Sequence, residues 1–151
     1  MRRQVREQTE VNVQLFVTGF KCSPNEITRI LGIPPTKAWV KGDPIIRSAS
    51  AVRRWNGWKI EAPPPKTTSP EAQTKALLAR IMPRAERFKH LPPGADVHLS
   101  CAIYAYDDSQ RVFEFSAKAV RELARIGAPI SIAYYDFTHL RKRKGVRRQT
   151  K

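Results

Sequence analysis

A chain of 151 residues, 41% of them hydrophobic and 27% charged, has the size and composition of one globular domain with a buried core. No apolar run of about eighteen residues occurs, so we expect no membrane span. The two cysteines are too few for a disulfide framework or a structural zinc site, and the basic first residues lead into no apolar stretch like that of a secretory signal. We therefore expect a reduced, cytoplasmic setting.

Charge is the most informative property of the composition. The chain has 28 Lys and Arg against 13 Asp and Glu, which gives a net charge of +15. Residues 141–151 carry seven basic residues and no acid, and residues 1–10 carry three basic and two acidic residues, which leaves 18 basic and 11 acidic residues between them. This division predicts a basic N-terminal arm (1–10), a single α+β domain (11–140) and a basic C-terminal tail (141–151). A basic excess that extends over the domain is typical of proteins that bind polyanions, although high charge also serves solubility alone.

The first half of the chain predicts two strands and a helix. Residues 11–20 alternate between aliphatic and other side chains, which indicates a half-buried strand. Ser23 and Pro24 begin a short helix that ends at Gly32. Residues 33–54 read as a turn-rich connection, and residues 55–60 as a second strand that ends before three prolines.

The second half predicts two helices and three strands. A helix begins at Ser69, and Pro83 is expected to break it near Met82. Residues 95–106 alternate throughout and give the clearest strand, followed by a short strand at 112–115. A helix capped by Ser116 ends at Gly127, and residues 130–137 form the last strand.

This order, β-α-β-α-β-β-α-β, predicts an α+β fold with a mostly antiparallel sheet and helices packed on one face. The helix at 23–32 and the helix at 116–127 share apolar spacing and a closing glycine. Helix caps alone can produce such a similarity, but the similarity also fits a duplicated split βαβ (ferredoxin-like) layout.

Several segments resemble the bacterial domain of unknown function 4279 family. The similarity rests on Gly19-Phe20, on Glu26-Ile27-Thr28 with the run from Leu31 to Thr36, on Lys41-Gly42-Asp43-Pro44, on the strand from Trp55 to Trp58, and on Leu99-Ser100-Cys101 and the run from Leu123 to Gly127. It covers roughly residues 11–137, and its motifs are mostly helix ends, turns and core positions. The resemblance implies a compact α+β domain and brings no established activity. The two basic ends lie outside it.

The best catalytic constellation is a row on one strand. Asp96, His98 and Ser100 occupy alternate positions and share a face, but any solvent-facing side of a strand has this spacing. No phosphate-binding glycine loop, nucleophile elbow or clustered carboxylates occur. We therefore expect no enzyme, no cofactor and no metal.

Aromatic residues offer a second kind of site. Phe16 and Phe20 on the first strand, and Tyr104 and Tyr106 on the third, are predicted to lie on the polar face, away from the aliphatic row, and Tyr135 and Phe137 have the same parity on the last strand. Rings exposed on an open sheet stack on the bases of single-stranded nucleic acid. The other interpretation is that these rings pack against one another across strands.

The charged ends supply candidate phosphate contacts, namely Arg2, Arg3, Arg141, Lys142, Arg143, Lys144, Arg147 and Arg148. Such contacts give affinity without reading sequence. We therefore expect a non-catalytic basic module that contacts nucleic acid (RNA or DNA) or a ribonucleoprotein with low sequence specificity, and no membrane. The alternative is a protein-interaction module, such as an immunity, anti-defence or inhibitor protein, that binds an acidic protein surface.

Overall fold

The computed structural model describes residues 8–46, 50–108 and 112–140. Its elements, in chain order, are β1 (Glu10–Thr18), α1 (Pro24–Leu31), β2 (Lys37–Trp39), β3 (Gly57–Glu61), α2 (Pro70–Ile81), the 3₁₀ helix η1 (Met82–His90), β4 (Asp96–Ala105), α3 (Ala117–Arg125) and β5 (Ile130–Asp136). The fold is therefore α+β, as the sequence predicts.

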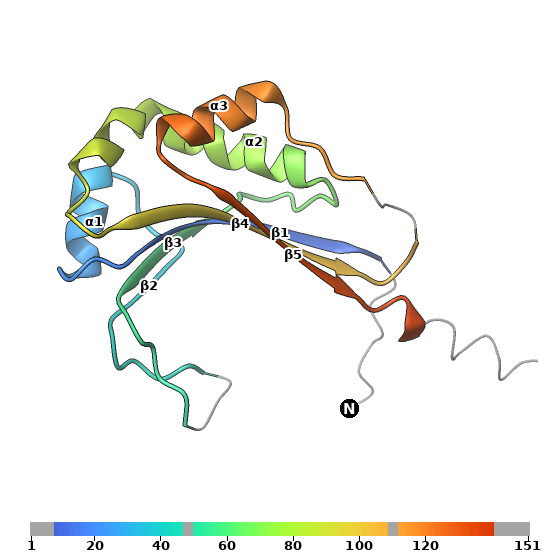
Figure 1. Cartoon of the computed structure of the whole chain (residues 1–151), viewed down its shortest axis with the longest axis horizontal. Coiled ribbons are helices and arrows are strands. Elements are labelled where there is room, and N and C mark those ends of the chain that lie inside the picture. The colour runs from blue at the N-terminus through green and yellow to red at the C-terminus, as the bar shows by residue number, and fades with distance from the viewer. Residues whose placement is uncertain (1–7, 47–49, 109–111, 141–151) are drawn as a thin grey trace, which may run out of the picture.

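The five strands form one sheet in the order β2-β3-β1-β4-β5. The β2–β3, β3–β1 and β1–β4 pairs are antiparallel and the β4–β5 pair is parallel, so the prediction of a mostly antiparallel sheet is confirmed. Figure 1 shows the sheet as an arch with α2 and α3 above it and α1 and η1 at one end, so that none of these four helices covers the concave side.

The first four strands have the order and directions of two interlocked split βαβ units. β1, α1 and β2 form one unit with β3 inserted between its strands, and β3, α2 and β4 form the other with β1 inserted. The structural partner of α1 is thus α2. The sequence similarity between the two helices had paired α1 with α3, but α3 connects β4 to the added parallel strand β5.

The core lies between the sheet and the helices. The aliphatic row of β1 meets side chains of β3, β4 and the helices there, and the largest fully buried members include Leu15, Trp58, Leu99, Ile27, Leu77 and Leu123. Burying this apolar area is what holds the helices on one face and leaves the other open.

Two predicted elements differ from the structure. Residues 112–115 form no strand. They belong to the connection from β4 through α3 to β5, which pairs with β4 directly, and Phe113 and Phe115 of this connection pack against the core. The extra strand is β2, within the segment expected to be a connection. The predicted helix break is confirmed, since α2 ends at Ile81 and η1 begins at Met82.

Candidate nucleic-acid interface

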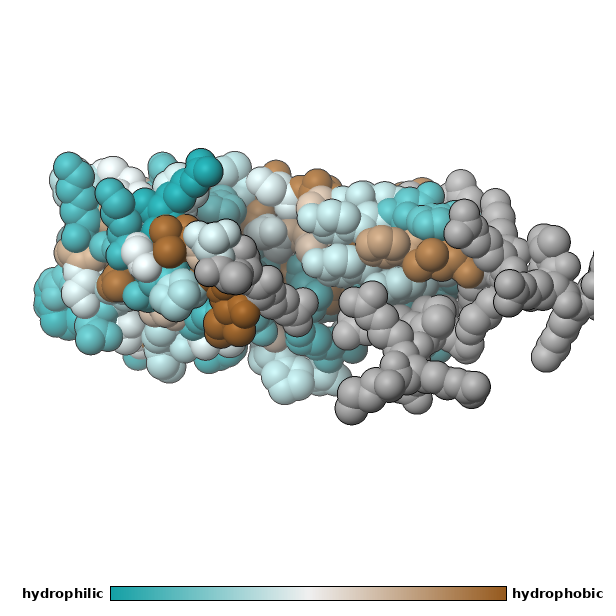
Figure 2. All heavy atoms as spheres, turned by 90° about the horizontal axis from the view of Figure 1, so that it is seen from below, coloured by the Kyte–Doolittle hydropathy of each residue, from teal (hydrophilic) through white to brown (hydrophobic). Residues whose placement is uncertain are grey.

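The concave face of the sheet carries the side chains that alternate with the core row. Figure 2 looks onto this face, where hydrophilic and weakly polar residues occupy most of the visible surface and brown hydrophobic residues lie in small separate groups among them. Aromatic side chains on this face form two groups, one toward the β2–β3 edge and one at the C-terminal ends of β4 and β5.

The first aromatic group is built on the register of β2, β3, β1 and β4. Phe16 pairs with His98 across the β1–β4 ladder, and their rings stack with centroids 5.1 Å apart. Trp39 meets Phe16 edge to face at 6.4 Å. Its indole also packs directly over Gly57, its partner on β3, where a larger residue would collide with the ring.

Two cations contact this first group. The Arg53 guanidinium lies 4.3 Å from the centroid of the Trp39 ring, and the Lys59 ammonium lies 5.9 Å from that of Phe16. Both are cation–π contacts that place positive charge beside the rings. Burial lowers the pKa of His98, against a smaller opposing effect of Asp96, so the imidazole in this stack is neutral at pH 7.

The second aromatic group is a set of stacked rings on β4 and β5. Tyr104 and Tyr135 are register partners with centroids 5.0 Å apart, and Tyr106 stacks on Phe137 at 5.3 Å. The Tyr135 and Phe137 rings are also nearly parallel, 6.5 Å apart along the chain. Tyr104, Tyr106, Tyr135 and Phe137 therefore share the open face, as their parity predicts, and they contact one another across the strands.

Small side chains separate the two groups on β4 and β5. Ser100 pairs with Ser131, and Ala102 pairs with Ala133, in the same parity as the Tyr104–Tyr135 pair. The open face thus has stacked rings on both sides of a short stretch where only hydroxyl and methyl groups rise from the sheet.

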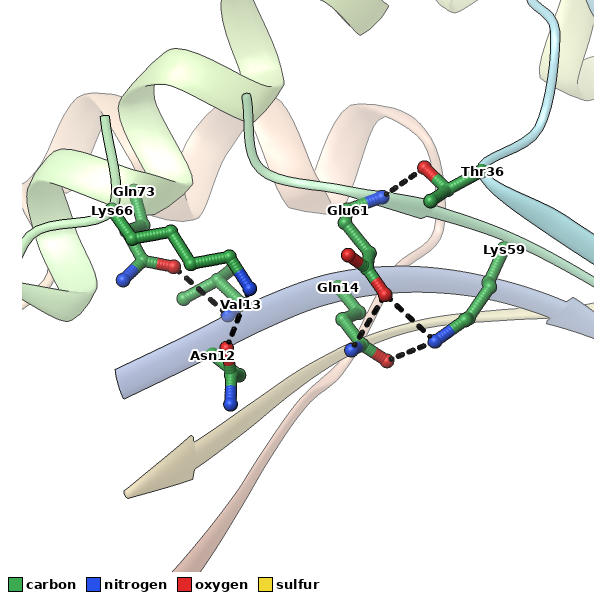
Figure 3. A network of polar contacts seen from close by, with 8 residues as sticks. All are labelled: Asn12, Val13, Gln14, Thr36, Lys59, Glu61, Lys66 and Gln73. Atoms are coloured by element: carbon green, nitrogen blue, oxygen red, sulfur yellow. Dashed lines mark hydrogen bonds and ion pairs between the residues drawn. The ribbon is translucent and has the colours of Figure 1, made fainter. Parts of the chain in front are cut away.

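A polar network continues this stretch onto β1 and β3 (Figure 3). The Lys59 ammonium contacts Glu61 at 2.9 Å and donates to Gln14 Oε1 at 3.2 Å, while Gln14 Nε2 donates to Glu61 at 3.3 Å. The bond from Lys59 is the main reason why the pKa of Glu61 lies below its usual value. The carboxylate on this part of the face is therefore neutralised by a neighbouring cation.

Phe20 corrects one prediction. It is 2% exposed and belongs to the hydrophobic core, so it does not share the open face with Phe16. β1 ends at Thr18, and Gly19 adopts a φ of 79°, which reverses the side on which the next residue lies. The strict alternation that the sequence analysis extended to residue 20 stops there.

Both basic ends of the chain begin at the same end of the sheet. β1 runs antiparallel to β4 whereas β5 runs parallel to it, so the start of β1 and the end of β5 lie at the same end of the sheet, on opposite sides of β4. Glu10 pairs with Tyr104, and the Leu140 N–H donates to the Phe137 carbonyl, both beside the second aromatic group. The candidate residues Arg2, Arg3, Arg141, Lys142, Arg143, Lys144, Arg147 and Arg148 lie outside the described residues.

The strand row that the sequence offered for catalysis also lies on the open face. Asp96, His98 and Ser100 belong to β4, but the ring of His98 is stacked on Phe16. Across residues 8–46, 50–108 and 112–140, no three His, Cys, Asp or Glu side chains are grouped as metal ligands. The helices of the described segments are also too short or too polar to cross a membrane.

Sequence reasoning missed Trp39 and Arg53 as parts of this face. Trp39 lies in a three-residue strand with no alternation to read, and Arg53 reaches it from the far side of the connection between β2 and β3. The sequence shows Trp39 in one segment and Gly57 in another, but it does not show that these two segments pair as β2 and β3.

Comparison with known proteins places the chain in a family. Neither the curated proteins nor the solved structures include a significant match to the chain. A family model matches residues 9–137, which is most of the chain. The protein therefore belongs to the family described as a domain of unknown function, DUF4279.

Proposed function

We propose that the protein is a non-catalytic module that binds single-stranded nucleic acid across the open face of its sheet, with low sequence specificity. The observation that carries this proposal is the second aromatic group. Its rings are stacked on one another and end at an outer ring, Tyr135, which is 46% exposed.

A nucleic-acid base would extend this stack. β5 is the outermost strand of the sheet, and the ring partners of Tyr135 within the described residues are Tyr104 and Phe137. Tyr135 is 46% exposed despite these two contacts, and its exposed ring surface would accept a base. Stacking of a base on an aromatic side chain contributes about 1–3 kcal/mol, whichever base is involved.

The cations near the face favour the phosphates of the same strand. Lys37 pairs with Lys59 at the β2–β3 edge, Arg53 covers Trp39, and Lys66 reaches Asn12 on β1 at 3.0 Å. The two basic ends of the chain begin at the opposite end, beside the tyrosines. A strand that crosses the sheet would pass from the cations of the β2–β3 edge, over the polar side chains of β1 and β3 and the small side chains of β4 and β5, to the tyrosines.

Low specificity follows from the kinds of contact involved. Stacking and phosphate contacts do not distinguish among the bases, whereas donors and acceptors aimed at base edges do. The polar groups in the middle of the face, Gln14, Lys59 and Glu61, already bond one another.

The proposal is tested by measuring the affinity of the full chain for a fluorescently labelled single-stranded oligonucleotide at several salt concentrations. We expect a linear fall of log affinity with log salt, with a slope of about 0.7 for each phosphate contacted. A chain that ends at Leu140 lacks the seven basic residues of 141–151 and should give a shallower slope. Affinity that does not change between low and moderate salt would contradict the proposal.

One observation favours the alternative, a protein-interaction module that binds an acidic protein surface. The connection between β2 and β3 presents large apolar side chains to solvent beside Lys41, Arg53 and Arg54, and these are Val40 (44% exposed), Ile46 (86%), Val52 (53%) and Trp55 (56%). An exposed tryptophan among arginines is a common anchor in protein interfaces. A protein partner that remains bound after nuclease treatment and is lost on Trp55→Ala would favour this function.

A further inference from the structure

A second cationic site lies on the helix side, at the end of the molecule where η1 packs against α1 (Figure 1). η1 is a 3₁₀ helix of nine residues, in which side chains three positions apart lie almost in line. One row, which includes Ala85 and Phe88, is buried. Arg84 and Arg87 belong to another row and therefore project together.

The two arginines converge on one glycine. Gly32, at the C-terminal end of α1, has no side chain, and a Cβ built on it would lie 2.6 Å from Arg87 Nη1 and 2.9 Å from Arg84 Nη1. Both guanidinium groups thus occupy the space above Gly32. Two like charges held in one place repel each other unless an anion or a dipole lies between them.

The acids nearby are already paired. Glu86 contacts Lys89 at 2.6 Å and Arg125 at 3.0 Å, and Glu26 forms its ion pair with Arg29. These bonds lower the pKa of both carboxyl groups, so both are ionised and engaged at pH 7. Within the part of the chain that the structure describes, the guanidinium group of neither Arg84 nor Arg87 has an ion pair or hydrogen bond.

The C-terminal carbonyl groups of α1 account for part of this arrangement. A helix C-terminus carries partial negative charge and attracts cations. Each guanidinium, however, has five N–H donors in a planar fork, and both side chains are exposed, so donors remain directed to solvent. Paired guanidinium forks match the oxygens of a phosphate group, which they bind by charge-assisted hydrogen bonds.

We propose that Arg84 and Arg87, held together above Gly32, form a binding site for a phosphate group. The site is separate from the open face of the sheet and does not rest on the function proposed for that face. Its ligand is either the backbone of a nucleic acid or a small phosphorylated molecule, and both present the same oxygens.

The test is an NMR titration of the full chain with sodium pyrophosphate, at ionic strength kept constant with sodium chloride. We expect the Gly32 amide and the side-chain Nε signals of Arg84 and Arg87 to shift with pyrophosphate. Arg84→Gln and Arg87→Gln should each weaken binding about tenfold, as expected for the loss of a hydrogen bond to a charged group. Arg121→Gln, an exposed arginine of α3, should have no effect.

Gly32→Ala has a matched control in Gly127→Ala. Both glycines follow helices and have similar φ angles, 66° and 70°, so both substitutions strain the backbone alike. Only at Gly32 would the new methyl group displace the guanidinium groups, because nothing lies within 4 Å of a Cβ at Gly127. Gly32→Ala should therefore weaken pyrophosphate binding and Gly127→Ala should not.

The same variants distinguish the two sources of phosphate. If Arg84→Gln and Arg87→Gln weaken binding of a single-stranded oligonucleotide as well, the site contacts a nucleic-acid backbone, and if only pyrophosphate is affected, the ligand is a small molecule. Both results uphold the site. A Gly32 signal that does not move, or equal pyrophosphate affinity in all variants, would show that the arginines only cap α1.

Discussion

The side chain of Gln73 on α2 takes the place of a neighbouring strand beside Val13 on β1. Its Oε1 accepts a hydrogen bond of 3.1 Å from the Val13 N–H, and its Nε2 donates to the Val11 carbonyl at 2.7 Å. The β1–β3 pairing begins only at Gln14, so these main-chain groups have no strand partner on that side. A buried glutamine thus completes the hydrogen bonding of the central strand (Figure 3).

Replacing Gln73 with Ala should lower the free energy of unfolding by about 1–3 kcal/mol, because buried main-chain groups of β1 lose their partner. Denaturant unfolding followed by circular dichroism measures this loss. An unchanged unfolding midpoint would mean that water replaces the side chain at no cost.

The adjacent residue provides the opposite case. Thr74 is 0% exposed, and its Oγ1 has no hydrogen-bond partner among the residues that the structure describes. Thr74→Val keeps the shape of the side chain and removes a buried hydroxyl group that has lost its hydrogen bonds to water without gaining one in the protein. We expect the same unfolding measurement to give equal stability or a gain of up to about 1 kcal/mol. A clear loss would reveal a partner for the hydroxyl.

Stability should fall as the solution is acidified below about pH 6.5, the ordinary pKa of histidine. Burial lowers the pKa of His98 in the folded protein, so the unfolded chain binds a proton more readily as pH falls through this range. Melting temperatures of the wild type and of His98→Phe, compared from pH 7 to pH 5, should diverge as the wild type loses stability. Parallel curves would show that His98 titrates normally.

The two cysteines should react at different rates with a thiol reagent. Cys101 is 0% exposed in the core, and its burial raises the pKa of its thiol, whereas Cys22 is partly exposed. Under native conditions we expect one thiol to be modified readily, and the second only after denaturant is added. Cys22→Ser should abolish the first reaction. Loss of the slow reaction instead would contradict the assignment.

The three α-helices and four of the five strands could be read from the sequence because alternation and helix caps are local signals. The strands at 10–18 and 96–105 and the caps at Ser23, Ser69 and Ser116 all appear where these patterns place them. The parity of Tyr104 and Tyr135 was equally local, and it correctly placed both rings on one face.

What the sequence could not provide depends on pairing between distant segments. Trp39 reaches the open face only because β2 pairs with β3, and Phe20 leaves that face because of one turn at Gly19. Arg84 and Arg87 meet Gly32 because η1 packs against the end of α1, which is far from it in the sequence.

The two neighbouring tyrosines of β5 provide the most direct test of the proposed function. Tyr135 (46% exposed) lies on the open face and Tyr134 (50% exposed) on the opposite face, so they are matched in size and exposure. We expect Tyr135→Ala to weaken binding of a labelled single-stranded oligonucleotide by tenfold or more in fluorescence anisotropy, as loss of a base stack predicts, and Tyr134→Ala to leave the affinity unchanged. Equal affinities for the two variants would contradict binding across the open face.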